Sequence, residues 1–121
     1  MTKPLSEFAQ FCLEMMALLA PVSAKRMFGG YGIYKNGVMF ALIVNDVLYL
    51  KTNLNTKSLF IEKQLEPFTY QKQGKTQTIA YYQCPEEAFD DETIMLSWAK
   101  TAYLVAIEAA SSENKHKSKI V

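Results

Sequence analysis

The N-terminal part of the chain changes from a helical to a strand pattern. Pro4 suits the first turn of a helix and Pro21 stops it. Between them, residues 5–19 predict an amphipathic helix. From residue 25 the spacing changes, and we predict a first strand over residues 25–35. The helical stripe consists of Leu5, Phe8, Ala9, Cys12, Met15, Met16 and Leu19.

Two further strands are predicted directly after the first. Asn36-Gly37 indicates a hairpin turn, because both residues tolerate positive φ. Residues 38–44 form the second strand, and after a turn at Asn45-Asp46 residues 47–52 form the third. The second strand is apolar on both faces, so we expect it at the centre of a sheet with both faces covered. Strict alternation places Val38, Phe40, Leu42 and Val44 on one face, and Met39, Ala41 and Ile43 on the other.

The second half of the chain predicts a helix, a hairpin and a long helix. Asn55 or Thr56 can cap the N-terminus of the helix predicted after the third strand, and Pro67 lies beyond the end of this helix. Residues 68–83 predict a hairpin over a turn at Gln73-Gly74, and its polar strands suit a sheet edge. The last helix begins after Asp90 or Asp91, with an apolar stripe of Ile94, Trp98, Ala102, Val105 and Ala109.

This order of elements, α-β-β-β-α-β-β-α, predicts an α+β fold with one antiparallel sheet of about five strands and helices packed on it. We expect one folded domain over residues 1–110. Residues 111–121 are polar and rich in lysine, and we expect them to form a disordered tail.

Composition and charge narrow the classes of function. No run of 18 apolar residues exists and the N-terminus does not resemble a signal peptide, so we expect a cytoplasmic protein without membrane contact. Cys12 and Cys84 are then expected to be buried, reduced thiols. The net charge of +1 becomes −1 without residues 111–121. Because phosphate neutralisation provides most non-specific nucleic-acid affinity, we expect duplex DNA to bind weakly.

Few residues could support catalysis. His116 is the only histidine and lies in the predicted tail, which removes Ser-His and Cys-His pairs and a histidine metal site from the folded part. The acidic residues 86–92 could include a general acid/base pair, but they also suit the capping of the last helix. We therefore expect that the chain is not an enzyme and that it binds neither a metal ion nor a cofactor.

The segment Arg26–Tyr34 contains the candidate binding residues. Gly29-Gly30-Tyr31-Gly32 superficially resembles a phosphate loop, but a strand follows it instead of a helix. Glycines in a strand indicate a bend or the close approach of another element. The aromatic residues beside Arg26 could form a stacking surface with a planar cation, or core aromatics with a structural ion pair. The candidates are Arg26, Phe28, Gly29, Tyr31 and Tyr34.

Several segments together resemble the N-terminal domain of the TfoX/Sxy competence regulators. They are Arg26-Met27-Phe28-Gly29-Gly30-Tyr31-Gly32-Ile33-Tyr34, Gly37-Val38-Met39-Phe40-Ala41-Leu42, Leu48-Tyr49-Leu50-Lys51-Thr52, Pro67-Phe68-Thr69-Tyr70, Ala80-Tyr81-Tyr82-Gln83-Cys84-Pro85 and Trp98-Ala99. The resemblance covers about residues 5–110. It implies a small α+β fold with a bent antiparallel sheet, similar to secretion-chaperone domains.

The resemblance also implies a regulatory role without catalytic residues. Full-length members act as coactivators of bacterial competence gene transcription alongside the cyclic-AMP receptor protein, so the implied partner is a protein of the transcription machinery. They carry a second, helical C-terminal domain, for which this sequence has no room. The chain is then either a stand-alone domain or part of a longer protein, and we do not expect this domain alone to contact DNA. The alternative is a small nucleic-acid-binding module that uses surface lysines and the C-terminal tail.

The two apolar faces of residues 38–44 also predict self-association. Three helices are expected to cover only one face of the sheet fully. The other face would then expose an apolar patch, and such patches usually mark an interface. We expect a twofold homodimer, because a twofold axis pairs the apolar patch of one copy with the same patch of the other.

Overall fold

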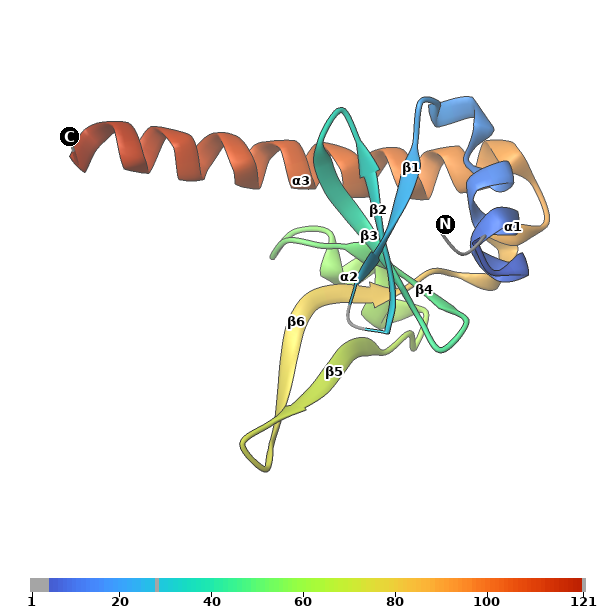
Figure 1. Ribbon diagram of the computed structural model, residues 1–121, viewed down its shortest axis with the longest axis horizontal. Coiled ribbons are helices and arrows are strands. Elements are labelled where there is room, and N and C mark those ends of the chain that lie inside the picture. Colours follow the sequence, from blue (N-terminus) through green and yellow to red (C-terminus); the bar gives the residue numbers. More distant parts are fainter. Residues whose placement is uncertain (1–4, 28, 121) are drawn as a thin grey trace.

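The computed structural model describes residues 5–27 and 29–120, with the backbone alone described for residues 113–120. Figure 1 shows a sheet with helices against one side and a hairpin that curls away from the other. In order, the elements are α1 (Glu7–Met15), the 3-10 turn η1 (Ala17–Leu19), β1 (Ser23–Met27), β2 (Gly30–Lys35), β3 (Val38–Val44), β4 (Val47–Lys51), α2 (Lys57–Glu62), β5 (Pro67–Lys72), β6 (Lys75–Gln83), the 3-10 turn η2 (Glu86–Phe89) and α3 (Glu92–Ile120).

The α+β class is confirmed, and the sheet contains six strands instead of about five. Its spatial order is β1-β2-β3-β4-β6-β5, and every neighbouring pair is antiparallel. The prediction of a single strand over residues 25–35 is wrong, because the chain reverses between Met27 and Gly30, which face each other across the β1–β2 pair. Gly29 in this turn has a φ of 76°, a conformation that glycine adopts without steric cost.

The three described helices pack on the same face of the sheet, which we call the helix face. One buried cluster joins Cys12 of α1, Phe60 of α2 and Met95 of α3 to the strands. On the sheet side it contains Tyr31, Ile33, Phe40, Ala41, Ile43, Leu48 and Leu50. The helix α3 can lie close to the sheet because its buried positions include small residues, namely Ala99, Ala102 and Ala106.

The opposite face of the sheet, which we call the groove face, differs from the prediction because of a β-bulge in β3. Tyr34 pairs with Met39 and Ile33 pairs with Ala41, so Phe40 is an extra residue with no partner on β2. A bulge of this kind shifts the alternation of side chains. Phe40 and Ala41 therefore both join the helix-face core, while Met39 and Leu42 lie on the groove face. The two faces predicted from strict alternation are wrong for this reason.

Turns and edges agree with the sequence pattern. The predicted turns at Asn36-Gly37, Asn45-Asp46 and Gln73-Gly74 each contain residues with positive φ. The polar hairpin of β5 and β6 places β5 at the edge of the sheet, as predicted. The predicted strand 38–44 lies third in the six-stranded order, inside the sheet.

The disordered tail expected over residues 111–121 stays a prediction, since only the backbone of residues 113–120 is described. The backbone of α3 continues to Ile120, and Figure 1 shows this last part extending away from the sheet. Residues 92–120 contain neither proline nor glycine, so no residue stops the helix after Ser111. Among the described residues, no helix combines the length and the apolar composition needed to cross a membrane.

Gly30 offers a sharp test of the close packing between β2 and β3. A Cβ atom at this position would collide with the backbone carbonyl of Ile43, which cannot move without disturbing the sheet. We expect Gly30→Ala to lower the free energy of unfolding by about 3 kcal/mol, as overpacking of a rigid site does. The control is Gly74→Ala, where φ is 76° and the space is open. This variant should cost about 1 kcal/mol. Equal urea midpoints for the two variants would contradict the packing described for Gly30.

Candidate interaction groove

The groove face is hollowed into an open apolar groove of about 760 Å³. Its volume lies in the range of pockets that bind ligands or partner side chains. The floor comes from β1 to β4 and one wall from the β5–β6 hairpin. The lining residues are Met27, Tyr31, Met39, Leu42, Val44, Asn45, Val47, Tyr49, Phe68, Thr69, Tyr70 and Ile79.

The floor of the groove follows from strand alternation in β4 and from the bulge in β3. Val47 and Tyr49 line the groove, while Leu48 and Leu50 between them are buried in the helix-face core. The bulge places Met39 and Leu42 beside them from the neighbouring strand. Strand alternation in the sequence therefore predicts which β4 side chains line the groove. Which β3 side chains line the groove depends on the bulge.

Gly32 allows two methionines to lie directly on the sheet. A Cβ atom built on Gly32 would lie 2.6 Å from Sδ of Met27 and 2.7 Å from Sδ of Met39. It would also lie 3.0 Å from the ring of Tyr34. The missing side chain at Gly32 thus leaves the space that these three groove-face side chains occupy.

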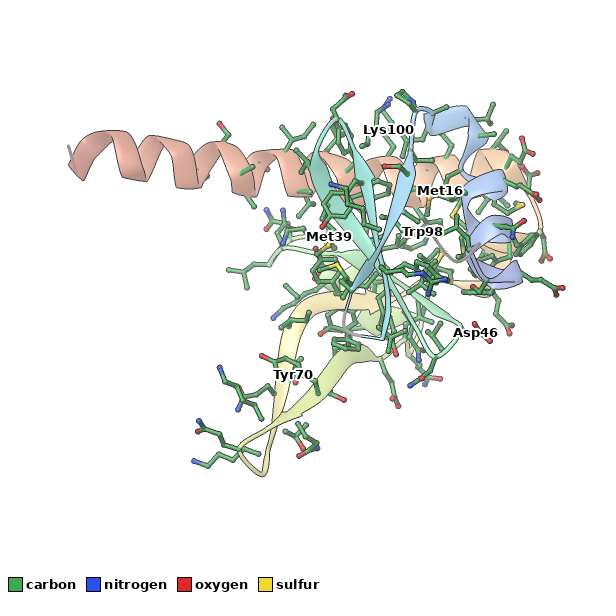
Figure 2. All side chains as sticks on the ribbon, in the orientation of Figure 1. Met16, Met39, Asp46, Tyr70, Trp98 and Lys100 are labelled. Atoms are coloured by element: carbon green, nitrogen blue, oxygen red, sulfur yellow. The ribbon has the colours of Figure 1, made fainter. Side chains whose placement is uncertain are left out.

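The β5–β6 hairpin forms an aromatic wall. The ring of Phe68 lies edge-on to Tyr49 with the centroids 5.2 Å apart, and stacks with Tyr70 at 6.2 Å. Tyr70 remains 40% exposed. Figure 2 shows Tyr70 on the hairpin, away from the labelled Met16 among the helices. The wall therefore presents an aromatic surface that no helix covers.

Two lysines and two tyrosines border the apolar part of the groove. Lys25 Nζ lies 4.8 Å from the ring centroid of Tyr34, and Lys51 Nζ lies 5.0 Å from that of Tyr81. Burial raises the pKa of Tyr81 to about 12, and Tyr34 contributes to this rise, so the two phenols lie near each other. The hydroxyl of Tyr34 lies 3.9 Å from Sδ of Met27, which lines the groove. These four residues form what we call the basic rim.

The structure separates the binding residues predicted from sequence. Arg26 lies over the ring of Tyr31 with its guanidinium carbon 5.2 Å from the centroid. Tyr31 borders the groove, but its hydroxyl accepts a hydrogen bond from the Ser6 amide at 3.0 Å, which lowers the pKa of Tyr31. Tyr34 instead belongs to the basic rim, and Gly29 lies in the exposed β1–β2 turn. Phe28 lies outside the described residues.

Sequence reasoning missed most of the groove. Lys25, Lys51, Tyr49, Phe68 and Tyr70 were not among the candidate residues. The alternation of Val47, Tyr49 and Lys51 was a usable signal, because it places all three on one face of a strand. No sequence pattern indicated that the distant hairpin would bring Phe68 against Tyr49.

The lining of the groove suits the binding of apolar groups. No carboxylate, thiol or imidazole belongs to its lining residues. Across the described part of the chain, no cluster of three or more His, Cys, Asp or Glu side chains could hold a metal ion. The groove therefore has the composition of an interaction surface.

The fold is that of a small α+β domain, and the sequence places the chain in a known family. Residues 14–106 match the family described as TfoX N-terminal domain, so the chain belongs to this family. It is 23% identical to Protein Sxy of Escherichia coli strain K12 over 101 residues. That match covers 84% of this chain and 48% of Sxy, so the chain spans about half the length of this relative.

Both cysteines lie in the helix-face core and do not belong to the groove lining. Cys12 and Cys84 are buried and are not joined to each other. Burial raises the pKa of Cys12 to about 12 and also raises that of Cys84, so neither is a reactive thiolate at neutral pH.

We expect both cysteines to react slowly with a thiol reagent such as Ellman's reagent. In native protein at pH 8 the labelling should depend on opening of the core, because the thiols are inaccessible and protonated. In 6 M guanidinium chloride two thiols per chain should react at once. Rapid labelling of Cys12 in the native protein would contradict the packing of α1 on the sheet.

Proposed function

We propose that this chain is a non-enzymatic regulatory interaction domain of the cytoplasm that acts in the transcription of competence genes. In this proposal the domain binds a protein of the transcription machinery, such as the cyclic-AMP receptor protein, through the groove face. The family membership supports the regulatory role. The relative Sxy is longer than this chain, so its role comes to this chain only as part of the proposal.

The observation that carries the proposal is the uncovered apolar groove. A concave site of this volume, lined mostly by apolar and aromatic side chains, is the kind of site that ligands or partner side chains occupy. The helices of the described chain all join the core on the other face of the sheet. Met27, Met39 and the aromatic wall offer adaptable, apolar contacts of the kind enriched in protein interfaces.

A direct binding assay tests whether the domain binds either of two transcription proteins. Tagged protein is incubated separately with purified cyclic-AMP receptor protein and with RNA polymerase, and retention is measured at matched concentrations. We expect one of the two to be retained, and Tyr70→Ser to reduce retention by roughly tenfold because the aromatic wall loses its exposed ring. The control is Leu54→Ser, since Leu54 is 82% exposed and does not line the groove. If neither protein is retained, the transcription partner is wrong. If both variants lose binding equally, the role of the groove is wrong.

We also propose that a twofold homodimer covers the groove in the absence of the partner. Light scattering coupled to size exclusion should report a dimer at micromolar concentration. The symmetric pairing of two groove faces would bring the lysines of the two basic rims together, so higher salt should strengthen the dimer by screening their repulsion. A monomer at every concentration and salt would contradict this proposal.

A further inference from the structure

Charge is strongly segregated between the sheet and the rest of the molecule. Residues 23–51 and 67–83, which contain the six strands, include a single acid, Asp46. Acidic side chains instead concentrate on the helices and the segment before α3. The basic residues of the strand regions are Lys25, Arg26, Lys35, Lys51, Lys72 and Lys75, and the acids outside them, within residues 5–112, are Glu7, Glu14, Glu62, Glu66, Glu86, Glu87, Asp90, Asp91, Glu92 and Glu108.

Two of these cations lie on the groove face, and within the described part of the chain neither forms an ion pair, although Lys51 also lines a second, smaller pocket with Glu108 of α3. Lys25 and Lys51 are held over the rings of the basic rim, beside the apolar lining. The acid of the strand regions, Asp46, lies in the β3–β4 turn next to Asn45, which lines the groove, and its charge acts on Tyr31, which borders the groove, and on Cys12 of the helix-face core. Lys35 is directed to the other side, where its Nζ donates to the carbonyl of Leu19 at 2.8 Å. The groove is therefore apolar inside, with Lys25 and Lys51 along one part of its border and a single acid, Asp46, in the turn next to it.

We propose that the groove binds an acidic amphipathic segment of a partner protein, whose apolar side chains fill the groove while its Asp or Glu side chains lie against Lys25 and Lys51. The inference rests on the proposed function, because it names the chemistry of the partner for the same surface. Complementary charge of this kind directs recognition and excludes partners of the wrong sign.

Two other occupants fit the groove less well. In a dimer of two groove faces, the lysines of the two basic rims would repel each other, so a second copy would bind the groove with low affinity. A single-stranded nucleic acid would find cations and rings, but it needs stacking platforms along a polar groove. Here Met27, Met39, Leu42, Val44 and Val47 form an aliphatic floor. A protein segment matches both the floor and the rim.

The test uses a phage library of random 16-residue peptides selected on the immobilised full chain. Enriched peptides are synthesised with a fluorescein label, and their affinity is measured by anisotropy. We expect them to combine Leu, Phe, Trp or Met with several Asp or Glu residues. Their affinity for the double variant Lys25→Glu/Lys51→Glu should fall roughly tenfold, and it should also fall with rising salt. The matched control is Lys57→Glu/Lys100→Glu, which makes the same charge change on α2 and α3 and should leave binding unchanged.

A charge swap separates recognition from a structural effect of the substitutions. A peptide with lysine in place of its acids should bind the wild-type chain weakly and the variant Lys25→Glu/Lys51→Glu more tightly. A misfolded variant could not gain affinity in this way. Circular dichroism melting of each variant confirms that the fold is retained.

Several results would overturn the inference. They are failure to enrich any peptide, enrichment of peptides without acids, or equal binding to wild type and the groove double variant. Tighter binding of a 16-nucleotide oligo-dT that displaces the peptide would assign the groove to nucleic acid. Peptide binding with the expected charge dependence, combined with no retention of either transcription protein, would leave the inference standing and contradict the proposed function alone.

Discussion

The structure depends on the packing of α3 across one face of the sheet. Ala99, Ala102 and Ala106 leave room for the helix backbone to approach, and larger side chains from the strands fill the space between them. Phe40 meets the ring of Tyr103 edge-on at 5.8 Å in this layer. Because α1 and α2 join the same layer, the apolar residues of the helix face form the main buried cluster. Within the described residues, no helix belongs to the lining of the other face.

The shape of that other face depends on two local departures from regular sheet geometry. The bulge at Phe40 turns Met39 and Leu42 toward the groove, and the β5–β6 hairpin brings Phe68 against Tyr49. A register shift also occurs in the hairpin between Pro67 and Thr69. Bulges bend and twist the strands that contain them. In this domain they help to convert a flat sheet face into a concave surface.

Charge is distributed unevenly between the strand regions and the rest of the chain. A net charge of +1 for the whole chain conceals strand regions with six basic side chains and one acid, while the other residues within 5–112 carry ten acids. In the proposed interaction, lysines beside an apolar groove would favour acidic partners and would oppose tight pairing of two identical copies.

The sequence by itself determined the identity and order of most elements. Helical spacing predicted α1 and α3, turn residues such as Asn36-Gly37 predicted the hairpins, and the apolar run of residues 38–44 predicted an internal strand. These features depend on interactions between residues close in the chain, so local patterns reveal them. The reversal at Gly29 was missed because a glycine-rich segment is compatible both with a continuous strand and with a turn.

The groove was decided by tertiary structure. The bulge at Phe40 arises from how β3 pairs with β2, and it reverses the faces that alternation assigns. Tyr31, which lies under Arg26, and Tyr34, which lies under Lys25, point to opposite sides of β2. Residue spacing alone could not show which of these sides faces the groove. The contact of Phe68 with Tyr49 joins residues far apart in sequence. Only the folded chain brings these side chains together, because their positions depend on strand pairing and bending rather than on local sequence.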